Sequence, residues 1–183
     1  MKKYIALLRA INVGGHRKIK MADLREMFIS MGFENVITYI QSGNVIFNAS
    51  DTDSENFARS IEQQIKNTFG YDVSVIIRSA NQVEELIGLN PFKDQDRSPF
   101  KIYITFFCEP PPDAKQQLLL DQSNETEIFR FVNGDLFSLI NKKTGQKERF
   151  SNNFVEKTIG IPGTTRNRNS LEKIFKLASN QTL

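Results

Sequence analysis

The sequence has few of the residues on which disulfide, metal and acid–base chemistry usually depend. Its 183 residues include one cysteine, Cys108, one histidine, His16, and no tryptophan. A lone cysteine excludes an internal disulfide framework and is typical of a reducing compartment. One His and one Cys also leave no zinc-type ligand set and no Cys–His or Ser–His–Asp arrangement with visible partners. The sequence therefore predicts no metal site, leaves the cofactor and the catalytic residues unknown, and leaves open whether the protein is an enzyme.

Long apolar runs are absent as well. Lys2 and Lys3 precede only five apolar or aromatic residues before Arg9 interrupts them, which is too short for a secretory signal. No stretch approaches the length of a membrane span. Hydrophobic residues make up 39% of the chain and charged residues 25%, a balance typical of globular proteins. We expect a cytoplasmic protein with no membrane partner.

The first part of the chain alternates strand-like and helix-like segments. Two strand-like segments flank the turn Gln41-Ser42-Gly43-Asn44, which is typical of a hairpin connection. Apolar spacing and glycine stops predict strands at residues 4–11, 36–40, 45–47 and 73–77, with helices at 21–31 and 57–69. This βαββαβ order predicts a ferredoxin-like (split βαβ) subdomain at residues 1–78.

The second part predicts another α+β subdomain, at residues 79–183. A Pro- and charge-rich connector at residues 90–99 marks the boundary region, and Asn133-Gly134 indicates a type I′ hairpin. Predicted elements are helices at 79–87, 113–121, 154–159 and 171–178 and strands at 100–107, 129–132 and 136–140. Residues 163–170 are predicted as a polar loop, so this half is expected to be a βαββαα variant. The fold class is therefore α+β with two small subdomains.

The segment INVGGHRKIK suggests an anion site. Seven Lys or Arg residues fall between Lys2 and Arg25, against the single acid Asp23. In a split βαβ sheet the first and third strands are antiparallel neighbours, so the loop at residues 13–20 should face the Ser42-Gly43-Asn44 turn. Glycine amides and nearby cations suit a phosphate or carboxylate. The predicted binding residues at this sheet end are Arg9, Asn12, Gly14, Gly15, Lys18, Lys20, Ser42, Gly43 and Asn44. The alternative is a tight turn carrying solvated basic residues.

A second polar motif, GTTRNRNS, precedes the last predicted helix. Arg166 and Asn167 could hold an anion or a carbonyl group in a bidentate manner. The alternative is structural, because Asn167 and Asn169 could satisfy local backbone groups while Arg166 pairs with an acid.

The motifs RAINVGG, TYIQSGNVIF and TTRNRNS together resemble a family of uncharacterised, mostly bacterial proteins, the domain-of-unknown-function family sixteen ninety-seven. The resemblance implies an α+β fold of two small subdomains, the first ferredoxin-like, and it implies no activity. Arg168 and Ser170 stand where the family commonly has Trp and Thr. The polar positions that match the family pattern are Arg9, Asn12, Gly14, Gly15, Ser42, Gly43, Asn44, Arg166 and Asn167.

Three classes of function remain open from the sequence. The basic segment predicts a partner such as RNA, although Tyr4 and Phe47 offer few aromatic surfaces for base stacking. A phosphorylated small molecule is the alternative ligand, for an enzyme or a sensor, but Gly14-Gly15 belongs to neither a Walker loop nor a dinucleotide fingerprint. A third alternative is a self-associating interaction module that forms a homodimer through an exposed edge strand next to Ile40.

Overall fold

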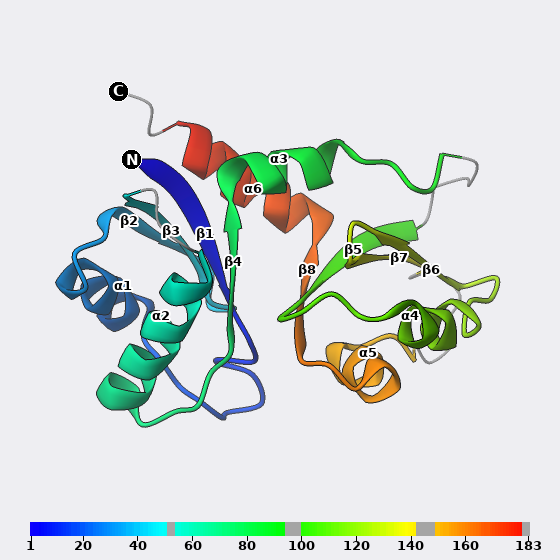
Figure 1. The fold of residues 1–183 in the computed structure, drawn as a ribbon, viewed down its shortest axis with the longest axis horizontal. Helices are drawn as coiled ribbons and strands as arrows, with labels where there is room; N and C mark the ends of the chain where they lie inside the picture. Colours follow the sequence, from blue (N-terminus) through cyan, green and yellow to red (C-terminus); the bar gives the residue numbers. More distant parts are fainter. Residues whose placement is uncertain (51–53, 94–99, 142–148, 181–183) are drawn as a thin grey trace. The chain divides into compact units, whose positions relative to one another are not determined.

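Two four-stranded antiparallel sheets, each with helices, make up the α+β fold (Figure 1). The computed structural model of the protein describes residues 1–50, 54–93, 100–141 and 149–180. The chain forms two compact units. Unit 1 consists of Met1–Leu86 with Glu172–Leu183, and unit 2 consists of Ile87–Leu171.

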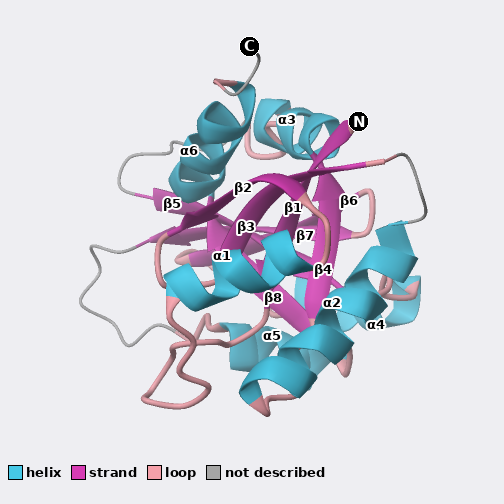
Figure 2. Cartoon of the chain, turned by 90° about the vertical axis from the view of Figure 1, so that its left-hand side faces the viewer, coloured by secondary structure: helices cyan, strands magenta, loops and turns pink. Residues whose placement is uncertain are grey.

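The sheet of unit 1 has the strand order β2-β3-β1-β4, in which β1 and β3 are antiparallel neighbours, as predicted. Helices α1 and α2 lie side by side across one face of this sheet (Figure 2). The elements are β1 (Lys2–Leu8), α1 (Met21–Ser30), β2 (Glu34–Tyr39), β3 (Asn44–Ala49), α2 (Ser54–Phe69), β4 (Val75–Ser79) and α3 (Ala80–Gly88).

Aromatic side chains fill much of the core between this sheet and its helices. Phe47 of β3 lies 4.5 Å from Phe33 and 5.8 Å from Tyr4, measured between ring centroids. Ile61 and Ile65 of α2 are fully buried in the same cluster. Each such side chain contributes about 1.5–3 kcal/mol by leaving water. The apolar spacing that predicts α2 therefore marks the face of the helix that packs on the sheet.

Strand β1 ends at Leu8, three residues before the predicted end at Ile11. Ala10 has φ +52° and Asn12 has φ +56°, both in the left-handed region. A β-strand cannot continue through such residues, so the apolar character of Ile11 misled the prediction. The Arg9 amide still donates to the Ser74 carbonyl at 2.9 Å, which keeps the chain beside β4 for one more residue.

Unit 2 contains the second sheet, in the order β6-β7-β5-β8. Asn133 and Gly134 have φ +53° and +82°, as the predicted type I′ turn requires. A core that includes Phe107, Leu136 and Val155 lies between the sheet and helices α4 and α5. The elements are β5 (Phe100–Phe107), α4 (Asp113–Leu120), β6 (Glu127–Val132), β7 (Asp135–Asn141), α5 (Asn152–Ile159) and β8 (Gly163–Asn167), followed by α6 (Arg168–Ser179).

Strand β8 corrects the prediction of a polar loop at residues 163–170. Gly163–Asn167 pairs antiparallel with β5, and Thr164 and Arg166 are buried. Two adjacent β-branched threonines favour an extended backbone, which outweighs the polarity of the segment. The second half is therefore βαββαβ followed by α6, and not a βαββαα variant.

Helix α6 passes from one unit to the other along the chain. Its residues from Glu172 onward group with unit 1, where the Lys3 ammonium donates to the Ala178 carbonyl. The division between residues 78 and 79 remains a prediction.

A hydroxyl network fixes β8 and generates a stability prediction. Thr165 Oγ1 lies 2.8 Å from Thr105 Oγ1 and donates to Asn152 Oδ1 at 3.0 Å. We expect Thr165→Val to lower the free energy of unfolding by about 1–3 kcal/mol, because the fully buried Thr105 hydroxyl loses a partner. Urea denaturation measures this change. Thr165→Ser keeps the hydroxyl and should cost less; equal losses in the two variants would contradict the role of the network.

Candidate functional site

The β1–α1 loop and the β2–β3 turn are joined by the side chain of Asn12. Its Nδ2 donates to the carbonyl oxygens of Ile19 and Gln41, each at 2.9 Å, and its Oδ1 accepts from the Ile19 amide at 2.8 Å. One side-chain amide thus closes the loop on itself and ties it to the turn. The predicted neighbours Asn12 and Ser42-Gly43-Asn44 come together at this sheet end.

Apolar packing and internal hydrogen bonds occupy the contact between these two segments. Ile11 is fully buried, and a Cβ built on Gly43 would lie 2.7 Å from Ile11 Cδ1 and 2.8 Å from Leu8 Cβ. Asn44 is also fully buried, and its Nδ2 donates to the Tyr39 carbonyl at 2.9 Å and to Ser42 Oγ at 3.1 Å. The contacts of Asn12, Ser42, Gly43 and Asn44 therefore hold the scaffold together.

The tip of the β1–α1 loop is exposed. Gly14 and Gly15 have φ +59° and +80°, and the His16 amide donates to the Val13 carbonyl at 3.1 Å. Lys18 and Lys20 are also exposed to solvent. Lys20 is the N-cap residue of α1, and its side chain makes no cap hydrogen bond within the described part of the chain. These residues contribute positive charge next to the scaffold.

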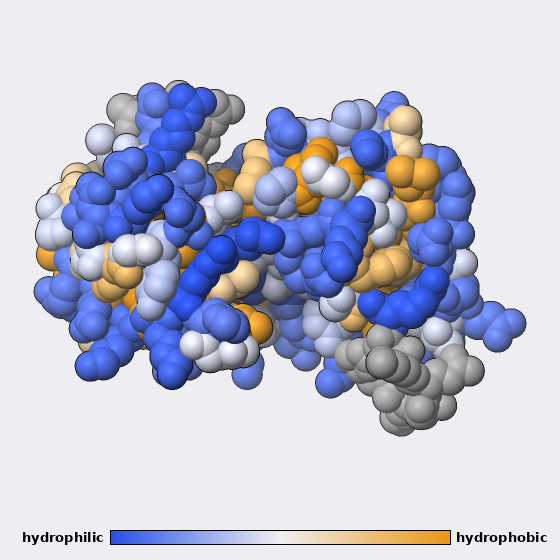
Figure 3. Space-filling model, turned by 90° about the horizontal axis from the view of Figure 1, so that it is seen from below, coloured by the Kyte–Doolittle hydropathy of each residue, from blue (hydrophilic) through white to orange (hydrophobic). Residues whose placement is uncertain are grey.

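A polar pocket of 460 Å³ opens beside this loop, within unit 1. Arg9 and Arg17 line it from the loop, α2 supplies one wall, and the α2–β4 connection supplies the rest. Figure 3 shows that hydrophilic residues dominate unit 1 at the end where these segments lie. The lining residues are Arg9, Arg17, Arg59, Glu62, Gln63, Lys66, Asp72, Val73 and Ser74.

Hydrogen bonds and an ion pair hold the pocket walls. Glu62 Oε1 accepts from the Val75 amide at 2.8 Å, which fixes α2 to the start of β4. Lys66 Nζ lies 2.8 Å from Asp72 Oδ1, with both side chains more than half exposed. The Arg9–Ser74 backbone bond described above fixes the opposite wall. The lining thus combines four basic and two acidic side chains on a frame held by main-chain contacts.

Sequence reasoning identified Arg9 but missed the contribution of α2. Arg59, Glu62, Gln63 and Lys66 follow the spacing i, i+3, i+4 and i+7, which places them on one face of a helix. The prediction used only the apolar face of α2. The polar face of α2 could be read from this spacing in the sequence. No local pattern, however, indicates that this face lies near Arg9.

Arg166 and Asn167 belong to unit 2. Arg166 is 7% exposed and donates to Thr164 Oγ1 at 2.7 Å and to the Thr165 carbonyl at 2.9 Å. Desolvation by burial lowers the pKa of Arg166 to about 10, so the side chain remains a cation at neutral pH. Asn167 Oδ1 accepts from the Asn169 amide at 2.9 Å. Asn167 therefore satisfies a backbone group in the first turn of α6, as the structural alternative for this residue states.

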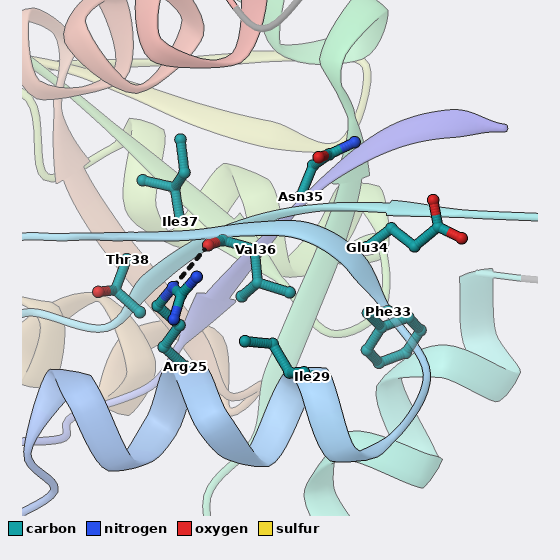
Figure 4. Close-up of a pocket in the computed structure, with 8 residues that line it drawn as sticks. All are labelled: Arg25, Ile29, Phe33, Glu34, Asn35, Val36, Ile37 and Thr38. Atoms are coloured by element: carbon teal, nitrogen blue, oxygen red, sulfur yellow. Dashed lines mark hydrogen bonds between the residues drawn. The ribbon is translucent and has the colours of Figure 1, made fainter.

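A second pocket, of 700 Å³, runs along the outer strand β2 (Figure 4). Arg25 of α1 reaches up from the helix, and its Nε donates to the Val36 carbonyl at 3.0 Å. The pairing of β2 with β3 is irregular between Glu34 and Ile37, and Asn35 has φ +51°. A bulge and a side chain on the strand edge both hinder pairing with another strand.

Two general features bear on chemistry. Within the described ranges, no group of three or more His, Cys, Asp or Glu side chains is placed to hold a metal ion. Among the same residues, every helix is too short or too polar to cross a bilayer.

Comparisons with known proteins give a matching family model and a similar solved structure. The model of a family described as a protein of unknown function (DUF1697) matches residues 1–137. A solved structure, that of a conserved bacterial protein from Streptococcus pneumoniae, is similar with a TM-score of 0.70 and 26% sequence identity, over 98% of this chain and 99% of that chain. None of the curated proteins matches this chain.

The contact between Gly43 and Ile11 predicts a strong substitution effect. We expect Gly43→Ala to lower the free energy of unfolding by at least about 2 kcal/mol, because the new methyl group clashes with Ile11 and Leu8 and the backbone has φ +76°. Gly15→Ala is the matched control, since Gly15 has φ +80° but no heavy atom within 4 Å of a built Cβ. It should cost only about 1 kcal/mol. Denaturant unfolding of both variants measures the two changes in the free energy of unfolding. Equal losses would mean that packing at Gly43 is unimportant.

Proposed function

The chain belongs to the DUF1697 family of proteins of unknown function, and we propose that it binds a phosphate-bearing anion in the pocket between the β1–α1 loop and α2. The observation that carries this proposal is the gathering of four basic side chains, Arg9, Arg17, Arg59 and Lys66, around one pocket. They come from two segments far apart in the sequence. Basic residues scattered at random over the surface would not be expected to gather around one pocket.

Electrostatics support an anionic ligand. Like charges brought to one pocket repel each other, and an anion placed among them relieves that repulsion. Glu62 and Asp72 offset only part of the positive charge. Arginine side chains also present several donors in the planar geometry that phosphate oxygens accept. The pocket is therefore better suited to a phosphate group than to a neutral ligand.

The proposed site lies nearer to α2 and the α2–β4 connection than the predicted site does. Arg9 belongs to both, whereas Asn12, Ser42, Gly43 and Asn44 have a supporting role because their contacts position the loop. Lys18 and Lys20 would add to the positive potential that attracts the ligand. The proposal also includes a ferredoxin-like description of unit 1, supported by the order β2-β3-β1-β4, and a cytoplasmic location. No residue is assigned a catalytic role.

Self-association through β2 is the second candidate. It is favoured by one observation, namely that β2 is an edge strand followed by Ile40, which is 48% exposed. The bulge near Asn35 and the Arg25 contact to Val36 weigh against it. Sedimentation of the native protein and of Ile40→Lys tests this candidate. A dimer that the substitution dissociates would support it, and a concentration-independent monomer would exclude it.

Calorimetric titration with inorganic pyrophosphate tests the proposed anion site. We expect Arg9→Ala and Arg17→Ala each to weaken binding about tenfold, because each removes a charge-assisted contact. Lys173→Ala, on the exposed surface of α6 and outside the pocket lining, is the control for lost positive charge and should leave the affinity unchanged. Thermal melts confirm that the variants fold. Equal affinity in all four proteins, or no binding by the native protein, would reject the proposal.

A further inference from the structure

The proposed anion pocket also contains two acidic side chains, which could serve as hydrogen-bond acceptors for a ligand. Glu62 and Asp72 line it together with the four basic residues. We infer that the ligand is a small phosphate monoester whose organic part carries a hydrogen-bond donor, such as a hydroxyl group. This inference rests on the proposed function, with the phosphate held by the arginines and the donor held by the carboxylates.

Glu62 is fixed in position. Its Oε1 accepts the Val75 amide at 2.8 Å, and its side chain is partly buried between α2 and β4. The second oxygen of the carboxylate takes no part in that bond. A carboxylate accepts several hydrogen bonds, so a donor on the ligand could bond Glu62 without disturbing the pocket wall.

Asp72 differs from Glu62, because a ligand could replace it as the ion-pair partner of Lys66. The Lys66–Asp72 ion pair has a separation of 2.8 Å, and the two side chains are 56% and 81% exposed. Exposed ion pairs of this kind are weak. A phosphate that takes Lys66 would leave the Asp72 carboxylate able to accept from the same ligand. The pocket therefore combines Glu62, an acceptor that the protein holds in place, with Asp72, an acceptor that a ligand could release from its ion pair.

Charge balance favours a monoester over a nucleic-acid chain. Among the residues that the structure describes, those lining the pocket carry two more positive than negative charges. A phosphate monoester carries close to two negative charges near pH 7 and matches that excess. A nucleic-acid strand continues past the pocket with a charge at every phosphate, and Glu62 and Asp72 would repel it within a Debye length.

The size of the pocket agrees with a small ligand. Its volume of 460 Å³ falls inside the range of about 300–1,000 Å³ that is typical of sites for small molecules. An extended polyanion needs a groove that tracks its backbone, usually with aromatic side chains for the bases. The described residues that line this pocket include no aromatic side chain.

Two matched phosphates test the inference by calorimetry: 2-hydroxyethyl phosphate, which carries the donor, and propyl phosphate, which has similar size and charge. We expect the hydroxyl compound to bind about tenfold more tightly. Glu62→Gln and Asp72→Asn should reduce that preference while both variants still bind propyl phosphate. Glu62→Gln keeps an acceptor for the Val75 amide, and Asp72 is largely exposed, so at least one variant should fold.

The outcomes separate this inference from the function on which it rests. Equal binding of the two phosphates, abolished by Arg9→Ala, would overturn the inference and keep the anion site. Competition by a single-stranded RNA oligomer with higher affinity than either phosphate would also overturn it. Failure of pyrophosphate and both esters to bind would reject the proposed function itself.

Discussion

The end of the unit 1 sheet depends on the side-chain amide of Asn12. Its three hydrogen bonds close the β1–α1 loop and connect it to the β2–β3 turn, and Ile11 packs directly on Gly43 beneath them. Without these contacts a loop with left-handed residues at Ala10, Asn12 and Arg17 would have many alternative conformations. Arg9 and Arg17 can face a defined pocket because the backbone between them is fixed. The residues that line the proposed site are thus positioned by neighbours that lie outside its lining.

Helix α2 links the core to the proposed site. One of its faces places Ile61 and Ile65 in the apolar cluster, and another lines the pocket with Arg59 and Lys66. Core packing therefore sets the position and rotation of the basic side chains. A helix anchored in this way loses less entropy when a ligand binds than a free loop would lose.

Much of the fold could be predicted from the sequence, because periodicity, glycine stops and the Asn133-Gly134 turn are local signals. The predicted end of β1 was wrong because the backbone dihedrals at Ala10 and Asn12 are set by tertiary contacts. Strand β8 was missed because its polar residues satisfy their groups inside the structure, as Thr165 does with Thr105. For the candidate site, Arg9 was predicted, whereas its proximity to Arg59 arises from the packing of α2, which no local pattern encodes.

The discontinuity of unit 1 has a consequence for the order in which the protein forms during synthesis. Strand β1 leaves the ribosome early, but the part of α6 that groups with it, from Glu172 onward, is translated after all of unit 2. Domains generally fold as their residues emerge. Unit 2 can therefore complete its sheet before the last helical segment of unit 1 has been translated. Translation must pass Ala178 before Lys3 meets its carbonyl partner.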